Sequence, residues 1–317
     1  MNVAKAFFPL AASLLLSGLL VGTTATAADA PKVVVSIKPV HSLVAAVMQG
    51  VGTPDLIVDG AASPHTYALK PSNARSLQQA QVVFWVGPGM EAFLQKPLAS
   101  LGSNATVVEL DQAPGITKLK FREGGAFEPH DDGDEPAAGE DHAHDHEEFD
   151  THLWLDPHNA KAMVAEITTS LVAADPTNAL IYEANQKALN EKLDALDTDI
   201  ASTLAPVKNK PFIVFHDAYQ YFEHRYGVRV SGSITVSPET IPGAQRVSEI
   251  HSKVADLGAT CVFAEPQFEP KLVNVVLEGT AAKSGVLDPE AATLPQGPDL
   301  YFTLMRGIAN SLKACLS

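Results

Sequence analysis

Three histidines stand where the chain leaves an apolar or acidic stretch, and imidazole is a common ligand of transition metals. His65 comes after the apolar run 56–58, His152 comes after an acidic segment, and His216 follows the run 212–215 directly. In open α/β sheets, ligands bind beyond the carboxyl ends of the strands. Each histidine alone is more often an ordinary half-buried side chain, but their shared placement indicates a metal site.

A tetrahedral zinc site needs a fourth ligand. Our candidate is Asp288, which follows a short apolar turn in the sequence Gly-Val-Leu-Asp-Pro. The same residue also fits a turn or N-cap position before Pro289. Water and a histidine of the acidic segment remain as alternatives for the fourth position.

The acidic segment is unlike the rest of the chain, because residues 123–150 carry 12 of the 37 acidic residues and no Lys or Arg. The segment has too few apolar residues to compensate for the conformational entropy that it would lose on ordering. We therefore expect a mobile surface loop over 122–150. Its histidines, interleaved with carboxylates, predict weak auxiliary metal binding; they are His130, His142, His144 and His146. The alternative is a solvated acidic loop that happens to contain histidine.

Short β-branched or aromatic runs alternate with helical patterns from residue 32 onward, which predicts an α/β fold with mostly parallel sheets. The runs are nearly continuous, as in strands buried on both faces. They cover residues 33–37, 56–58, 82–86, 106–110, 212–215 and 261–263. Apolar stripes at helical spacing begin at residues 40, 247 and 300.

One helical pattern continues from Asp175 to about Leu204 without a strand, with Asp175 as its expected N-cap and Pro176 at its first helical position. We expect a long rigid helix over 175–205 between an N-terminal lobe (28–174) and a C-terminal lobe (206–317). The metal site then lies in the cleft between the lobes. A single stiff helix also predicts that the lobes do not close by a large movement.

The first 27 residues have the pattern of a secretory signal peptide, with one lysine, an apolar run over 10–21 and Ala-Thr-Ala at 25–27. The run is short for the alternative, a membrane anchor. Hydrophobic residues make up 46% of the chain, which is typical of a globular protein. The net charge of −15 argues against a nucleic-acid partner, which would require a basic patch.

Cys261 and Cys315 are the only cysteines of the chain. An exported protein meets an oxidising compartment, so we expect one disulfide between them. Two unpaired buried thiols are the alternative. A thiolate metal site is disfavoured, because the spacing is wide and no Cys-x-x-Cys occurs.

Several stretches, in order, resemble the zinc-uptake substrate-binding proteins of the ZnuA type. The resemblance covers essentially the whole mature chain, including the acidic segment and the late cysteine pair. Its motifs are residues 60–72 around His65, 83–88 with Met90-Glu91, 152–157 and 215–219. It implies two α/β lobes joined by a long rigid helix, with His65, His152 and His216 as imidazole ligands of one Zn²⁺ in the cleft.

The resemblance also implies a periplasmic receptor, not an enzyme, that delivers zinc to an inner-membrane ABC permease; we expect a monomer. Some family members carry an acidic residue just before the first histidine, where this chain has Pro64. Manganese-binding relatives carry a carboxylate where this chain has His216, and three imidazoles favour zinc. A zinc hydrolase, a metal buffer and a manganese receptor are the alternatives, although no His-Glu-x-x-His or Gly-x-Ser-x-Gly motif is present.

Overall fold

The computed structural model describes Met1 and residues 30–122, 127, 149–235, 242–256 and 261–317. Within them the chain forms two lobes, each built on a four-stranded parallel sheet. The first sheet contains β1 (Val33–Val35), β2 (Asp55–Leu56), β3 (Val82–Trp85) and β4 (Thr106–Glu109). The second contains β5 (Pro211–His216), β6 (Arg229–Thr235), β7 (Cys261–Ala264) and β8 (Lys283–Val286).

The two sheets have the same topology. Their strand orders are β2-β1-β3-β4 and β6-β5-β7-β8, so in each sheet the second strand lies outside the first and the third and fourth follow on the other side. In such a sheet the strand order reverses between the first and third strands. Ligands bind beyond the carboxyl ends of these two strands. The predicted parallel sheets are therefore confirmed, together with a repetition of topology between the lobes.

The helices are α1 (Lys38–Val47), α2 (Pro71–Gln79), α3 (Gln95–Leu101), α4 (Pro157–Ala174), α5 (Ala179–Leu204), α6 (Gln220–Tyr226), α7 (Ala244–Asp256), α8 (Lys271–Leu277) and α9 (Leu300–Leu316). Apolar residues at helical spacing explain α1, α7 and α9, and each of these stripes contains buried residues. In α7 these buried positions are Ile250 and Val254, which pack with strands of the second sheet in a smaller core cluster.

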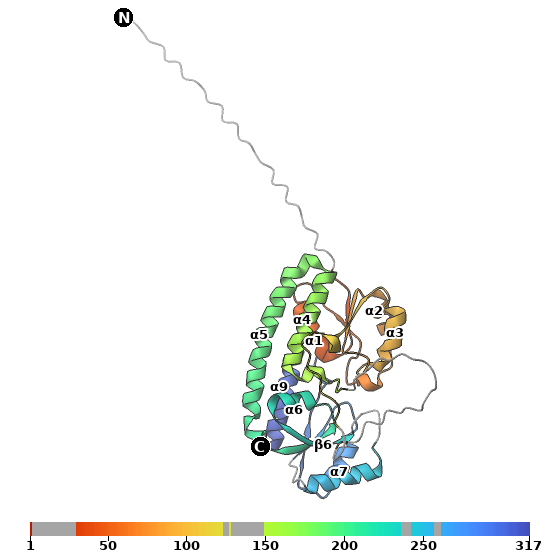
Figure 1. The fold of residues 1–317 in the computed structure, drawn as a ribbon, viewed down its shortest axis with the longest axis vertical. Helices are drawn as coiled ribbons and strands as arrows, with labels where there is room; N and C mark the ends of the chain where they lie inside the picture. The colour runs from red at the N-terminus through yellow and green to blue at the C-terminus, as the bar shows by residue number, and fades with distance from the viewer. Residues whose placement is uncertain (2–29, 123–126, 128–148, 236–241, 257–260) are drawn as a thin grey trace.

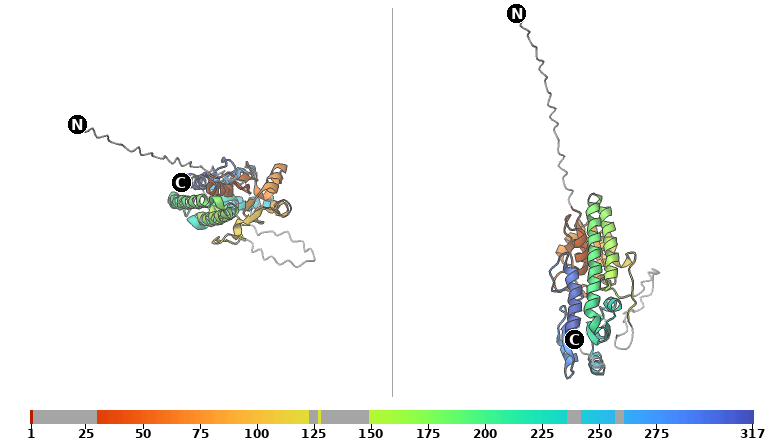
Figure 2. Two further views of the ribbon diagram at one scale, coloured as in Figure 1. Left: turned by 90° about the horizontal axis from the view of Figure 1, so that it is seen from above. Right: turned by 90° about the vertical axis from the view of Figure 1, so that its left-hand side faces the viewer.

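The long helix is α5, and at 26 residues it extends about 39 Å. It runs along both lobes beside α4 (Figures 1 and 2). Its start differs from the prediction: Pro176–Asn178 form a separate 3₁₀ turn, and the Asp175 carboxylate caps no backbone group. Instead Asp175 Oδ2 accepts hydrogen bonds from Asn178 Nδ2 at 2.7 Å and from the Tyr182 hydroxyl at 2.9 Å.

The two lobes also share direct contacts at the seam between them. The buried Lys38 ammonium, at the start of α1, donates to the backbone oxygens of Ala291, Ala292 and Leu294 at 3.0–3.2 Å. The Trp154 indole donates to Pro289 O at 2.8 Å. The α9 helix packs against both α1 and α5, and the main core cluster contains residues of both lobes. The seam is therefore a packed interface, consistent with the expected rigidity.

A disulfide joins Cys261 of β7 to Cys315 of α9, as the sequence predicted. Its sulfurs are bonded to each other and are not metal ligands. The bond attaches α9 to the second sheet, while the other end of α9 contacts α1 of the first lobe.

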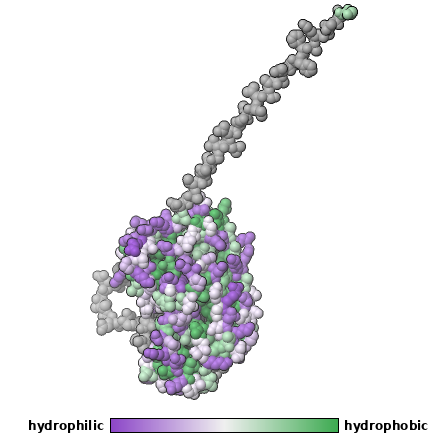
Figure 3. Space-filling view, turned by 180° about the vertical axis from the view of Figure 1, so that it is seen from behind, coloured by the Kyte–Doolittle hydropathy of each residue, from purple (hydrophilic) through white to green (hydrophobic). Residues whose placement is uncertain are grey.

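The surface mixes hydrophilic and hydrophobic residues, as the rear face shows (Figure 3). Exposed large apolar side chains of the described residues are scattered, and they include Leu180, Val275 and Val286. In the described part of the chain, no helix combines the length and apolar character needed to cross a bilayer. The expected signal peptide lies outside the described residues, apart from Met1.

Candidate metal centre

Three separate elements present the three predicted histidines. His65 is the middle residue of a 3₁₀ turn, Pro64–Thr66, whose N-cap Ser63 accepts a hydrogen bond from the His65 backbone N–H. His152 precedes a second 3₁₀ turn, Leu153–Leu155. His216 is the last residue of β5, at the carboxyl end where the strand order of the second sheet reverses. Two ligand candidates thus come from the first lobe and one from the second.

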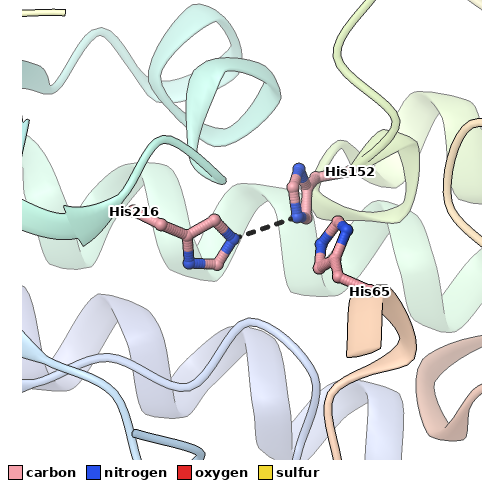
Figure 4. Close-up of side chains that lie close together, drawn as sticks. All are labelled: His65, His152 and His216. Carbon is pink, nitrogen blue, oxygen red and sulfur yellow. Dashed lines mark hydrogen bonds between the residues drawn. The ribbon is translucent and has the colours of Figure 1, made fainter. Parts of the chain in front are cut away.

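The three imidazoles converge at the seam between the lobes (Figure 4). One nitrogen from each ring lies within 4.8 Å of the other two, and the ring centroids are 5.1–5.9 Å apart. The Nε2 atoms of His152 and His216 lie 3.2 Å apart. Two nitrogens bound tetrahedrally to one zinc ion at about 2.0–2.1 Å are about 3.3 Å apart. The spacing therefore suits two ligands of a single small cation.

A buried carboxylate bonds the Nδ1 atom of His152, and another bonds that of His216, on the side of each ring away from the centre of the histidine group. His152 Nδ1 donates to Asp150 Oδ1 at 2.7 Å, and His216 Nδ1 lies 2.8 Å from both Glu265 oxygens. An ionised carboxylate only accepts hydrogen bonds, so Nδ1 of each ring must carry the hydrogen. When the ring is neutral, its Nε2 then presents a lone pair to the centre, which is the orientation and tautomer that metal-binding histidines need.

Sequence reasoning missed both carboxylates, and of the two only Asp150 has a local signal in the sequence. Strands β5 and β7 pair with Phe212 opposite Cys261 and Ile213 opposite Val262. Continuing that register by three residues sets His216, the last residue of β5, opposite Glu265, the first residue after β7. Asp150 lies two residues before His152, close enough for its carboxylate to bond both the backbone N–H and the ring of His152.

Burial shapes the proton affinity of the three rings differently. Desolvation lowers the pKa of His65 and of His152 well below 6.5, and the neighbouring histidines lower both further. For His216 desolvation is the largest effect and also acts downward, but the Glu265, Asp217 and Asp150 carboxylates together outweigh it and raise the pKa above 6.5. Burial raises the pKa of Asp150 to about 6, so this carboxyl is ionised at neutral pH. His65 and His152 are thus neutral and ready to bind a metal at neutral pH.

Asp288, the predicted fourth ligand, lies outside this group in the described structure. Its Oδ1 accepts from Gln267 Nε2 at 3.0 Å and from the Glu290 backbone N–H at 3.3 Å, which is the turn role that the sequence also allowed. The acidic-segment histidines lie outside the described residues; they are His130, His142, His144 and His146. The structure therefore brings together three of the predicted ligands.

Residues 33–315 match the family described as "Zinc-uptake complex component A periplasmic". The chain belongs to this family. It is 56% identical over 305 residues to the high-affinity zinc uptake system protein ZnuA of Brucella suis biovar 1, covering 90% of this chain and 91% of that protein. The ZnuA of Yersinia pestis is 38% identical over 313 residues, covering 96% of both chains.

A crystal structure of ZnuA superimposes on this chain with a TM-score of 0.75 at 26% identity, covering 91% of this chain and all of that one. The family is one of uptake components rather than enzymes. Family membership thus agrees with the resemblance that the motifs around the three histidines indicated.

The Glu265 carboxylate gives this family member a testable feature. We expect Glu265→Ala to weaken zinc binding about 10–100-fold, because the His216 ring loses the partner that fixes its tautomer and orientation. Glu265→Gln should lose less, since its amide oxygen can still accept from Nδ1. Competition with a chromophoric chelator measures both dissociation constants. Equal affinities for wild type and Glu265→Ala would show that the ring is oriented by other contacts.

Proposed function

We propose that this chain is the zinc receptor of a periplasmic ABC importer, which captures Zn²⁺ between His65, His152 and His216 and delivers it to a membrane permease. The observation that carries the proposal is the convergence of three imidazoles, from both lobes, on one point. Relatives named as high-affinity zinc uptake proteins support the choice of zinc and of transport. We further propose that the receptor acts as a monomer.

The fourth zinc ligand in this proposal is a water molecule. The Asp288 carboxylate already accepts hydrogen bonds in its turn, and Pro64 has no ligating side chain. A water ligand exchanges readily, which suits a cargo ion that must leave again. Asp288→Ala should accordingly change zinc affinity less than the loss of any of the three histidines.

A hydrolase would also accept three histidines and a water, but it needs a general base near that water. The carboxylates that contact the imidazoles, Asp150 and Glu265, are engaged with ring nitrogens on the side away from the centre. A manganese receptor is disfavoured by the ligand type, because Mn²⁺ prefers oxygen and this group offers nitrogen. Transport of zinc is the function that these ligands support best.

Metal titration tests the proposal. The mature protein should bind one Zn²⁺ tightly, with Mn²⁺ unable to displace it at equal concentration. Deleting residues 123–148 should leave that tight phase and remove only weaker additional binding, which we assign to the acidic segment. Loss of the tight phase on deletion would favour the buffer function and would place a primary ligand in the segment. Preference for Mn²⁺ would refute the zinc assignment.

Zinc affinity should fall as the pH is lowered, because imidazole must be neutral to bind a metal. His216 has the raised pKa, so it takes up a proton first, while His65 and His152 stay neutral to much lower pH. The groups around His216 that set this order are Glu265, Asp217 and Asp150.

Below the His216 pKa, one proton should therefore compete with each zinc, and the dissociation constant should rise about tenfold per pH unit. Chelator competition between pH 7.5 and 5 measures the slope, which should steepen below about pH 6, where the Asp150 carboxylate that holds His152 also takes up a proton. A flat profile would argue against imidazole ligands, and a slope near three would show that all three rings titrate together.

A further inference from the structure

The two ends of the acidic segment are joined to each other and lie against the second lobe. Lys120 and Phe149 form an antiparallel bridge, and the Asp150 N–H donates to Leu119 O at 2.9 Å. The Tyr221 hydroxyl of α6 donates to Asp150 O at 2.6 Å and accepts from the Leu119 N–H at 3.0 Å. We call residues 119–122 with 149–150 the stem. The stem is thus fixed to α6 beside the carboxylate that holds His152.

Arg122 connects the same stem to the neighbourhood of His216. Its guanidinium bonds Asp217 through Nε, at 3.0 Å, and through a second nitrogen, and its Nη1 lies 2.8 Å from Glu223 Oε1. All three side chains are largely shielded from water, with exposed fractions of 23%, 4% and 13% for Arg122, Asp217 and Glu223. Bidentate arginine–carboxylate pairs fix geometry as well as charge.

Asp217 follows His216 directly, in the turn that the Ala218 N–H closes onto His216 O at 2.9 Å. The position of the Asp217 carboxylate therefore restrains the backbone that carries the His216 ring. On its other side the stem includes Asp150, whose carboxylate bonds His152. The stem thus contains the carboxylate that supports His152 and binds the carboxylate next to His216, although these two histidines come from different lobes.

We propose that Arg122 is a positioning residue of the zinc site, which sets His216 relative to His152 by tying the turn after β5 to the stem. The inference rests on the proposed function, because it names what aligns the ligands across the seam. It differs from the roles of Asp150 and Glu265, since Arg122 touches no ligand and acts on the backbone that carries one. Arginine suits the role, because lysine can make only one of the two directed bonds to Asp217 at a time.

Zinc affinity and dissociation rate of Arg122→Ala, Arg122→Lys and wild type test this proposal. Arg122→Ala should bind zinc about tenfold more weakly and release it faster. Loss of the hydrogen-bond partner of a metal-binding histidine lowers metal affinity about 10–100-fold, and we expect the lower end of that range because Arg122 acts indirectly. Arg122→Lys keeps the charge and should recover part of the loss. The matched control is Arg225→Ala, because Arg225 of α6 forms another bidentate pair, with Asp197 of α5. Its further ion pair, at 3.9 Å, is with Asp156 at the start of α4 and not with the residue that follows His216.

A second readout separates positioning from general stability. The imidazole ¹⁵N signals of His216 in the protein prepared without metal should shift in Arg122→Ala and stay unchanged in Arg225→Ala. Circular dichroism checks that each variant is folded, and Arg122→Lys carries the test if the alanine variant is not.

Unchanged His216 signals and unchanged zinc affinity in Arg122→Ala would overturn the proposal. A loss of zinc affinity of the same size in Arg225→Ala would also overturn it, since the effect would then be one of stability alone. If wild type bound no zinc tightly, the proposed function would fail, while a shift of the His216 signals in Arg122→Ala alone would still support the positioning role.

Discussion

Replacing His152 with alanine should abolish tight zinc binding, with a loss of affinity greater than the about 10–100-fold that removing a ligand's own hydrogen-bond partner costs. The His152 ring is buried, its Nδ1 is held by Asp150, and its Nε2 lies 3.2 Å from that of His216. Removing it deletes one of three converging ligands, and the remaining pair must complete the coordination with water. The same reasoning predicts comparable losses for His216→Ala and His65→Ala.

Chelator competition with zinc measures these losses, and thermal unfolding shows whether each variant is folded. His158→Ala is the matched control, because His158 lies six residues further on, is exposed on α4 and belongs to no group of converging ligands in the described structure. It should bind zinc like wild type. Near-native affinity in any one of the three histidine variants would remove that residue from the metal's ligands.

Reducing the Cys261–Cys315 disulfide should lower the free energy of unfolding by about 4 kcal/mol, the chain-entropy value for a loop of this length. The bond closes a loop with a sequence separation of 54 residues, and opening it frees that loop in the unfolded chain. Urea unfolding of the oxidised and reduced wild type measures the difference without changing any side chain. The Cys261→Ala/Cys315→Ala variant adds the effect of the cavity left at buried Cys261.

Zinc binding should survive this reduction, because neither sulfur belongs to the histidine group. Chelator competition on the reduced protein, at a temperature where it stays folded, tests that separation. A loss of zinc affinity on reduction would show that α9 and β7 transmit strain to His216 and Glu265. An unchanged unfolding midpoint would mean that the reduced chain keeps the loop closed by other contacts.

The sequence predicts those strands whose own residues form a continuous apolar run. The continuous apolar runs predicted the central strands β1, β3, β5 and β7, which are buried on both faces. They also predicted β2 and β4, at the edges of the first sheet. The strands β6 and β8 were missed: β6 reads Arg-Val-Ser-Gly-Ser-Ile-Thr and β8 reads Lys-Ser-Gly-Val. Both lie at an edge of the second sheet. Ser and Gly interrupt both strands, so no continuous apolar run marks them.

The same distinction applies to the residues of the site. Some are marked by the sequence next to them, and others depend on partners far away in the chain. His65, His152 and His216 could be selected because each stands at the end of a recognisable run or motif. Glu265 and Arg122 could not, because their roles depend on pairing with residues 49 and 95 positions away. Asp288 was chosen for its place in the chain, but the backbone of its own turn competes for its carboxylate. Such competition appears only once neighbouring backbone positions are known.

The packing of α9 against α1 has a consequence for the order in which the molecule is completed during synthesis. The Tyr301 backbone N–H donates to Ser42 Oγ at 3.0 Å, and these residues are 259 positions apart in the sequence. Lys38 and its acceptor Ala291 O are separated by 253 positions. At a synthesis rate of about 5–20 residues per second, the residues of the first lobe exist several seconds before those partners do. Until then the α1 surface that receives α9 stays uncovered, so the first lobe cannot complete its packing before the last helix of the chain is available.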